Sequence, residues 1–256
     1  MNTLILPANS EKEIILDQDT DNTITIGKNS QVKVIDTGKG NVNIKLEENA
    51  HVMYIALKTQ SEESRKHAVV GKNAALHWIE CYLGGNINTS IRTELQGEAS
   101  ETTIQGVIFG DKENQIQVTN EIIHAASESK SNMLTRIVLK DKAQAAYTGL
   151  VKIQPGKKNC QGYQKKETIL LSNDARIKAD PNLEIENNEV QCSHGATISQ
   201  LDKEKLFYMT SRGIPESIAK KTIVEGFFNP ILEKITHEKI KQQVQQLIAQ
   251  GLEGVQ

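Results

Sequence analysis

The chain has 256 residues, of which 38% are hydrophobic and only 4% aromatic, and its formal net charge is −2. This composition supports one large domain with an aliphatic core, and the mixed charges indicate neither a nucleic-acid-binding nor a membrane-surface protein. Its apolar runs are too short to cross a bilayer, and three widely spaced cysteines do not form a disulfide framework. A reducing cytoplasm is the expected location.

From Thr3 to about Thr197, short segments of alternating apolar and polar residues are separated by polar turns. Residues 23–26, 31–34 and 42–46 are clear examples. Strict alternation is typical of a half-buried β-strand, and no long helical period interrupts this region.

A small residue follows a polar turn residue repeatedly in the same region. The pairs are Asn29-Ser30, Asn49-Ala50, Asn73-Ala74, Glu98-Ala99, Lys142-Ala143 and Asp174-Ala175, with first gaps of 20, 24 and 25 residues. A drifting period of this size predicts a solenoid whose coils turn at the small residues. An antiparallel sandwich is the alternative, although the Asn-Gly and Asp-Gly turns of tight hairpins are scarce.

After Thr197 the apolar spacing becomes helical. Asp202 is expected to cap a helix, and Gly213 to end it in the left-handed conformation. The pattern therefore divides the chain into a β body over residues 1–200 and a C-terminal helical domain over residues 201–256.

Two further helices are expected in the helical domain. Pro215 suits the first position of one of them, and Asn229-Pro230 is expected to break it and start the next. The expected apolar faces are Ile218, Ala219, Ile223 and Phe227 in one helix and Ile240, Val244, Leu247 and Ile248 in the other, which ends near Gly251.

A specific motif lies between Pro181 and Phe228. It consists of Pro181-Asn182-Leu183-Glu184-Ile185, Val190-Gln191-Cys192-Ser193-His194-Gly195-Ala196-Thr197, Leu206-Phe207-Tyr208, Ser211-Arg212-Gly213-Ile214 and Gly226-Phe227. This motif resembles the C-terminal signature of the SufB/SufD family, and its Cys-Ser-His-Gly-Ala-Thr core is similar to the SufD-type branch. The resemblance is looser upstream, through His124, Gly149 and residues 161–164.

The resemblance implies an all-β solenoid, a right-handed parallel β-helix with a C-terminal α-helical domain. It also implies a non-catalytic scaffold of a Suf-type iron–sulfur cluster assembly complex. Such a scaffold binds a SufC-like ABC-type ATPase and dimerises with itself or with a SufB-type chain. Sulfur comes from a cysteine desulfurase relay, and a transient iron–sulfur cluster forms at the subunit interface. The involvement of flavin is left open.

Cys192 and His194 are two residues apart, so on a strand both side chains face the same way. A thiolate and an imidazole can hold iron or pass sulfur, but two ligands do not close a metal site, and the spacing alone favours packing. The family motif reverses this preference and makes both residues candidate cluster ligands and metal ligands. In the resemblance, Ala175 replaces a sulfur-accepting cysteine of SufB-type chains, and Gly195 replaces a glutamate.

Nearly half of the scarce aromatic residues lie in the helical domain. The candidate contacts to the ATPase are Leu206, Phe207, Tyr208, Arg212 and Phe227, since an aromatic-rich helical knob suits a partner groove. Packing of these helices on the solenoid is the simpler alternative. The chain has no G-x-x-x-x-G-K-[ST] phosphate loop of its own.

The remaining residues of chemical interest have modest expected roles. Cys160, flanked by Lys158, is expected to be a surface thiol, Cys81 to pack in the core, and His124 to make a structural hydrogen bond. The lysines of residues 157–158 and 165–166 are expected to be solvated turn charges.

Two alternatives to the scaffold remain open at this point. One is a carbohydrate-active β-helix enzyme, which would need clustered carboxylates and aromatic sugar platforms. The other is a family member that only anchors the ATPase and has lost cluster chemistry.

Overall fold

The structure is a computed structural model that describes residues 1–253. The strands are β1 (Asn2–Leu6), β2 (Glu11–Leu16), β3 (Asn22–Ile26), β4 (Gln31–Asp36), β5 (Val42–Leu46), β6 (His51–Lys58), β7 (Glu62–Val70), β8 (Ala75–Tyr82), β9 (Ile87–Leu95), β10 (Glu101–Gly110), β11 (Gln115–His124), β12 (Lys130–Leu139), β13 (Gln144–Ile153), β14 (Cys160–Leu170), β15 (Arg176–Ile185) and β16 (Val190–Gln200). The helices are α1 (Lys203–Ser211), α2 (Glu216–Leu232) and α3 (Glu238–Gly251).

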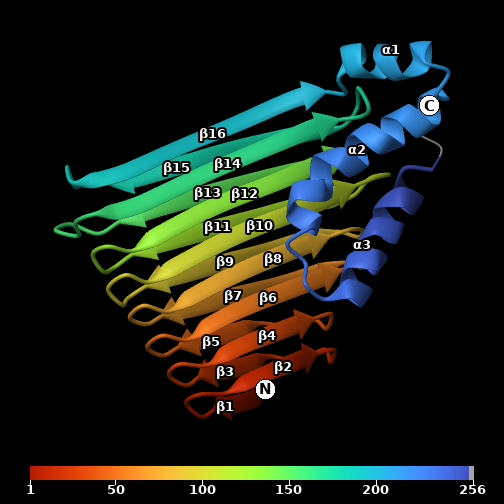
Figure 1. The fold of residues 1–256 in the computed structure, drawn as a ribbon. Helices are drawn as coiled ribbons and strands as arrows, with labels where there is room; N and C mark the ends of the chain where they lie inside the picture. The colour runs from red at the N-terminus through yellow and green to blue at the C-terminus, as the bar shows by residue number, and fades with distance from the viewer. Residues whose placement is uncertain (254–256) are drawn as a thin grey trace.

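The strands form two eight-stranded sheets (Figure 1). The odd-numbered strands make one sheet, here sheet A, and the even-numbered strands make the other, sheet B. Each strand pairs in parallel with the strand two places along the chain, so one odd and one even strand make one coil. The predicted parallel β-helix with C-terminal helices is confirmed, and the antiparallel sandwich is excluded.

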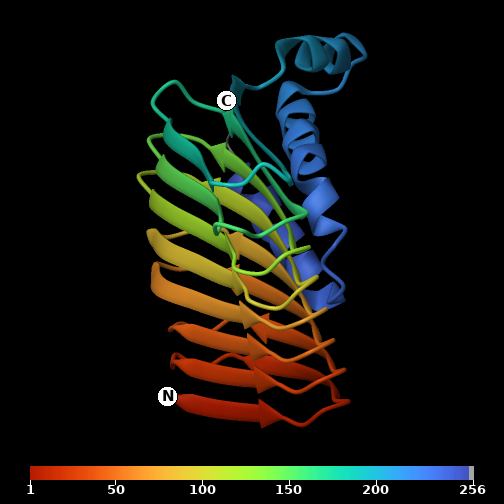
Figure 2. The same ribbon diagram turned by 90° about the vertical axis from the view of Figure 1, so that its left-hand side faces the viewer.

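The coils grow along the chain. Asn2 pairs with Asn22, 20 residues on, whereas Gln144 pairs with Arg176, 32 residues on. The strands lengthen from 5 residues in β1 to 11 in β16. The solenoid is therefore a wedge with its wide end at β15 and β16, as Figures 1 and 2 show.

The turns explain the drifting repeat. Asn29, Asn49 and Asn73 have positive φ angles of 56°, 57° and 53°, which asparagine tolerates better than most residues, and each precedes a small buried residue. The predicted pair Glu98-Ala99 is wrong by one position. Ala99 itself has φ 53°, and Ser100 is the buried small residue.

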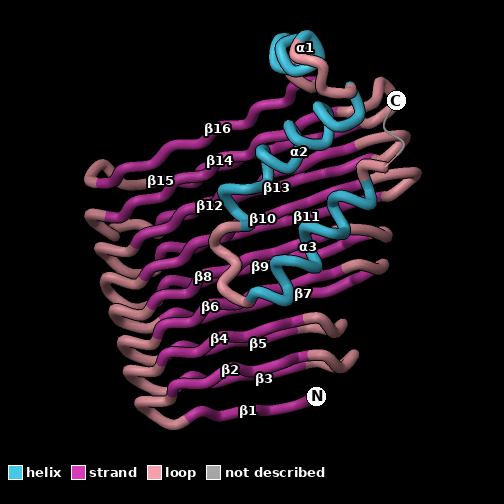
Figure 3. Tube along the Cα trace, turned by 45° about the vertical axis from the view of Figure 1, so that its right-hand side comes forward, coloured by secondary structure: helices cyan, strands magenta, loops and turns pink. Residues whose placement is uncertain are grey.

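Two apolar layers hold the structure together. One fills the lumen between the sheets, from Leu6 near the narrow end to Val151. The other lies on the outer face of sheet B, where α2 and α3 cross the strands (Figure 3). Because the strand ends in sheet B are covered on both faces, the alternation gives way there to continuous buried runs, which include Lys58 and Glu80.

The helix signals are partly confirmed. The Oδ1 atom of Asp202 accepts hydrogen bonds from the N–H groups of Glu204 (3.1 Å) and Lys205 (3.0 Å), and Gly213 has φ 83°. Pro215 is the N-cap of α2 rather than its first helical residue. In the described chain no helix is both long and apolar enough to span a membrane.

Two expectations for α2 are wrong. Ala219 is buried as predicted, but Val224 and Phe228 are buried in place of Ile223 and Phe227, and Ile218 is 52% exposed. Pro230 does not break the helix, which continues to Leu232. Phe228, Ile231 and Leu232 all pack into the layer on sheet B, and this packing holds the last turn around the proline. In α3 the buried residues are Ile240, Val244 and Ile248, as predicted, with Leu247 packed beside them.

Candidate functional site

The wide end of the solenoid is open. β15 and β16 are the last strands of their sheets, and β16 pairs only with β14 among the described residues. In the preceding coils the side chains that face the lumen are buried, whereas those of β16 are exposed or half-buried. Ile198, for example, is 51% exposed. The lumen-facing side chains of the last coil are thus accessible to solvent.

Cys192 and His194 both lie on this surface. Their register partners on β14 are Gly162 and Gln164, which face the lumen, so the two candidate ligands face it too. Cys192 is half-buried and His194 is exposed. The Cys192 thiol lies over the glycine: a Cβ atom on Gly162 would stand 3.4 Å from Cys192 Sγ. Partial burial raises the pKa of the Cys192 thiol, and a backbone hydrogen bond from Gly162 opposes part of that shift.

These two residues alone do not make a metal site. Among residues 1–253, no three His, Cys, Asp or Glu side chains come together in a geometry that could hold a metal ion. Iron and zinc bound by sulfur and nitrogen usually take four ligands. Cys192 and His194 of one chain are therefore too few to close such a site.

A hydrogen-bonded group lies in the lumen below Cys192. His124 Nδ1 is 2.7 Å from Ser129 Oγ and Nε2 is 2.8 Å from Ser131 Oγ, which confirms the predicted structural role of His124. Cys160 is fully buried and its thiol donates to the carbonyl of Ala126 (3.4 Å). The expected surface position of Cys160 is wrong, because the first residue of β14 faces the lumen.

Lys166 is the second misplaced residue. It was expected to be a solvated turn charge, yet it lies in the middle of β14 with its side chain in the lumen and 3% exposed. Its neighbour Lys165 points outward and pairs with Glu167 (Nζ to Oε1, 2.7 Å). Alternation along β14 separates the two lysines, and the sequence does not tell which of them faces inward.

The two most exposed aromatic residues lie on α1, which has no buried residue. Phe207 is 72% and Tyr208 60% exposed, and the Arg212 guanidinium lies 5.2 Å from the centre of the Tyr208 ring. Leu206 lies half-buried on the same helix. Phe227 is separate from them on α2, half-buried, with the Arg136 guanidinium 5.0 Å from its ring.

Comparison with known proteins accounts for this arrangement. Residues 8–227 match the sequence profile of the SUF system FeS cluster assembly SufBD core domain. The chain belongs to the SufBD family. The match begins far upstream of the residues that carry the resemblance, so it includes nearly all coils of the solenoid.

Individual relatives agree with this assignment. The SufBD-family chain is 30% identical over 213 residues to the iron–sulfur cluster assembly protein SufD of Escherichia coli, covering 80% of this chain and 50% of the relative. It is 28% identical over 207 residues to SufD of Bacillus subtilis, covering 78% and 47%. A SufBD family protein of Mycobacterium tuberculosis is 30% identical over 199 residues, covering 74% and 50%. The chain spans about half the length of these relatives.

The SufBD-family chain also carries a buried ionic network that its sequence did not reveal. Lys58 pairs with Asp36 (2.8 Å) and Glu62 (3.6 Å), and Lys66 pairs with Glu80 (2.5 Å), all inside the lumen. Charged residues at alternating positions are typical of a solvent-exposed strand face, so the pattern alone predicts that these side chains point outward. The only sign of this network in the sequence is that its lysines and acids occupy alternate strand positions, the positions that face the lumen.

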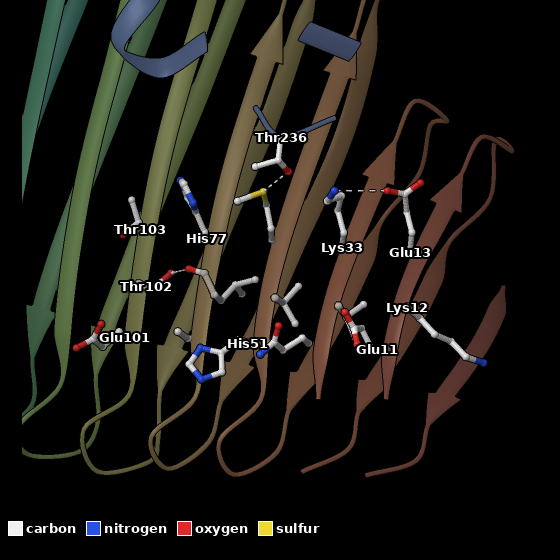
Figure 4. A pocket seen from close by; sticks show the side chains of 16 residues that line it. Glu11, Lys12, Glu13, Lys33, His51, His77, Glu101, Thr102, Thr103 and Thr236 are labelled. Carbon is white, nitrogen blue, oxygen red and sulfur yellow. Dashed lines mark hydrogen bonds and ion pairs between the residues drawn. The ribbon is translucent and has the colours of Figure 1, made fainter. Parts of the chain in front are cut away.

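A groove lies on the outer face of sheet B beside the connection between α2 and α3 (Figure 4). It has a volume of about 640 Å³ and includes Glu11, Glu13 and Glu101, of which Glu13 pairs with Lys33 (3.7 Å). Among its described lining residues none is Phe, Tyr or Trp. The groove therefore lacks the aromatic platform that the carbohydrate-active alternative needs.

Proposed function

We propose that this chain is a non-catalytic scaffold subunit of a Suf-type iron–sulfur cluster assembly complex, and that its open end is the assembly site. The observation that carries the proposal is the position of Cys192 and His194. Both face the lumen on the last strand of the solenoid, where a covered coil would have buried them. The cluster is cargo that the scaffold holds and passes on.

The second half of the site comes from a second subunit. The free edge of β16 offers unpaired backbone groups, and exposed Ile198 adds an apolar contact. A second copy of this chain, related by a two-fold axis, would bring another Cys/His pair and complete a set of four ligands. A SufB-type chain would complete it asymmetrically, and would supply the sulfur-accepting cysteine that Ala175 replaces. A cysteine desulfurase in the reducing cytoplasm is the proposed source of sulfur.

The test replaces Cys192 with Ser and His194 with Ala, each alone. Ser193→Ala is the matched control, because Ser193 lies between them on the opposite face of β16. Iron and acid-labile sulfide are measured after anaerobic reconstitution, and dimer content by light scattering. We expect both variants to lose bound cluster while the dimer stays intact, and the control to behave as wild type. Equal cluster content in all four proteins would remove the site from consideration.

We further propose that the helical domain over residues 201–256 docks an ABC-type ATPase through α1. Exposed Phe207 and Tyr208, with Arg212 stacked beside them, form the anchor, with Leu206 on the same helix and Phe227 on the neighbouring α2. Deleting the whole helical domain is a poor test, because α2 and α3 cover the apolar outer face of sheet B.

Substitution on α1 is the sharper experiment. Phe207→Ala with Tyr208→Ala should abolish co-purification of a SufC-like ATPase, whereas Ile218→Ala, another exposed apolar residue, should retain it. Retention of the ATPase by the double variant would show that docking lies elsewhere. A chain that binds the ATPase normally but takes up neither iron nor sulfide would instead be an anchor without cluster chemistry.

A further inference from the structure

Three lysines are buried among residues 1–253, and one of them differs from the others. Lys58 and Lys66 each pair with carboxylates in the lumen. Lys166 is as deeply buried, but its Nζ atom has no hydrogen-bond partner in the described chain. An unpaired buried ammonium group is strongly unfavourable unless an anion compensates it.

No protein anion forms a hydrogen bond with Lys166 in the described chain. Its register partners are Thr135 on β12 and Ala196 on β16, both uncharged. The charge of Asp180 on β15 partly raises the pKa of Lys166, but Asp180 pairs with Lys178 (3.3 Å). Burial lowers the pKa of Lys166 to about 8, so the amine remains largely protonated at neutral pH.

The cover over Lys166 is thin and faces the candidate cluster site. A narrow crevice beside the lysine, with no room for a water-sized molecule, is lined by Tyr147, Gln164, Pro181 and Gly195. Ala196, the register partner of Lys166 on β16, is the second residue after His194 and is exposed. The hydroxyl of Thr168, two residues along the same face of β14, is also buried without a partner. Two buried donors without partners thus lie on the same face of β14, Lys166 beneath Ala196 and Thr168 beneath Ile198 of the last strand.

We infer that Lys166, with Thr168, is an anion-binding site at the wide end of the lumen that holds an anionic sulfur species, hydrosulfide or the sulfide edge of a cluster. This inference rests on the proposed function for the choice of anion. The ammonium and hydroxyl groups donate hydrogen bonds to the sulfur, and the iron is bound further along β16 by His194, which lies over Gln164, and Cys192, which lies over Gly162. The interaction is non-covalent, so no electron or leaving group is transferred.

The experiment separates anion binding from cluster assembly. The iron-free chain is titrated anaerobically with sodium sulfide by calorimetry, in wild type, Lys166→Met and Lys165→Met. Lys165 is the matched control, adjacent in sequence but 61% exposed on the outer face. We expect Lys166→Met to bind sulfide about tenfold more weakly, the loss of one charge-assisted hydrogen bond, and Lys165→Met to match wild type. Sulfide binding equal to wild type in Lys166→Met, or none in wild type, would overturn the inference.

Two further measurements make the result decisive. Thermal unfolding of Lys166→Met should show an unchanged or higher Tm, since an unpaired buried charge has been removed. If the methionine variant does not fold, Lys166→Gln keeps a hydrogen-bond donor without the charge, and should show the same loss of sulfide binding. Cys192→Ser and His194→Ala should still bind sulfide without iron. If they also assemble clusters normally while Lys166→Met loses sulfide, the proposed cluster ligands are wrong and the anion site stands.

Discussion

Acid should destabilise this protein through His124. Its ring is fully buried between two serine hydroxyls, and burial lowers its pKa from 6.5 to about 4. Ser129 Oγ donates to the carbonyl of Ala126, so it accepts from His124 Nδ1, and Nε2 is left as an acceptor for Ser131. The folded state therefore holds a neutral imidazole.

The sign and size of the effect follow from the two pKa values. The unfolded chain takes up a proton below about pH 6.5, whereas the folded chain resists protonation until about pH 4. The stabilisation is fully present above pH 6.5 and is lost as the pH falls through 4. The complete loss is about 3 kcal/mol, of which about 2 kcal/mol falls between pH 7 and 5. For a chain of this size, that corresponds to roughly 5 °C in Tm.

The assay compares the Tm of wild type and His124→Gln at pH 7 and pH 5. Glutamine keeps a donor and an acceptor for the two serines but does not titrate. Contributions from all other groups are common to both proteins and cancel in the difference. We expect wild type to lose about 5 °C more than the variant over this interval. Parallel pH profiles for the two proteins would show that His124 is not held neutral by burial.

Two further predictions concern the solenoid itself. Lys66→Met should lower the free energy of unfolding by about 3–5 kcal/mol, because it leaves Glu80 as an uncompensated buried charge. The free energy is measured by denaturant titration, with Lys72→Met at an exposed turn as the control that should change little. A comparable loss in that control would contradict the reasoning. Asn49→Ala should cost about 1 kcal/mol and Asn49→Gly less, because φ at this turn is 57°. An Asn49→Gly variant that is no more stable than Asn49→Ala would place the cost in the lost side-chain hydrogen bond to Asn29 (2.9 Å) instead.

The sequence could predict the coil architecture because its signals are local. Several turns, such as those at Asn29, Asn49 and Asn73, place an asparagine at positive φ with a small residue after it, and most strands begin with alternating residues. Asp202 and Gly213 mark the limits of α1 in the same local way. These features depend on few residues, so a single chain reveals them.

The contents of the lumen could not be predicted in the same way. On β14 the inward positions hold Cys160, Gln164 and Lys166, and the outward positions also hold polar residues such as Lys165. With no contrast in polarity between the two faces, alternation does not tell which face is buried. A similar ambiguity explains the error in α2. Two adjacent apolar stripes run along this helix, and only contact with sheet B selects Phe228 over Phe227 as the buried residue.

The spacing of residues along the sequence was not enough to predict the candidate site. Two residues on one strand, Cys192 and His194, are a weak signal, and their value comes from lying at the end of the sheet. The family motif pointed to them, whereas Lys166 has no such motif and emerges only from its burial and its missing partner.

The one-sided pairing of β16 has a consequence for local unfolding. In a solenoid each coil is stabilised mainly by its two neighbours, and the last coil has only one. Like the first coil, residues 190–200 therefore belong to a weakly protected end of the body, which can open while the inner coils remain folded. A second subunit on this edge would act as the missing neighbour. Slow amide hydrogen exchange along β16 would then record the assembled state, and fast exchange the free chain.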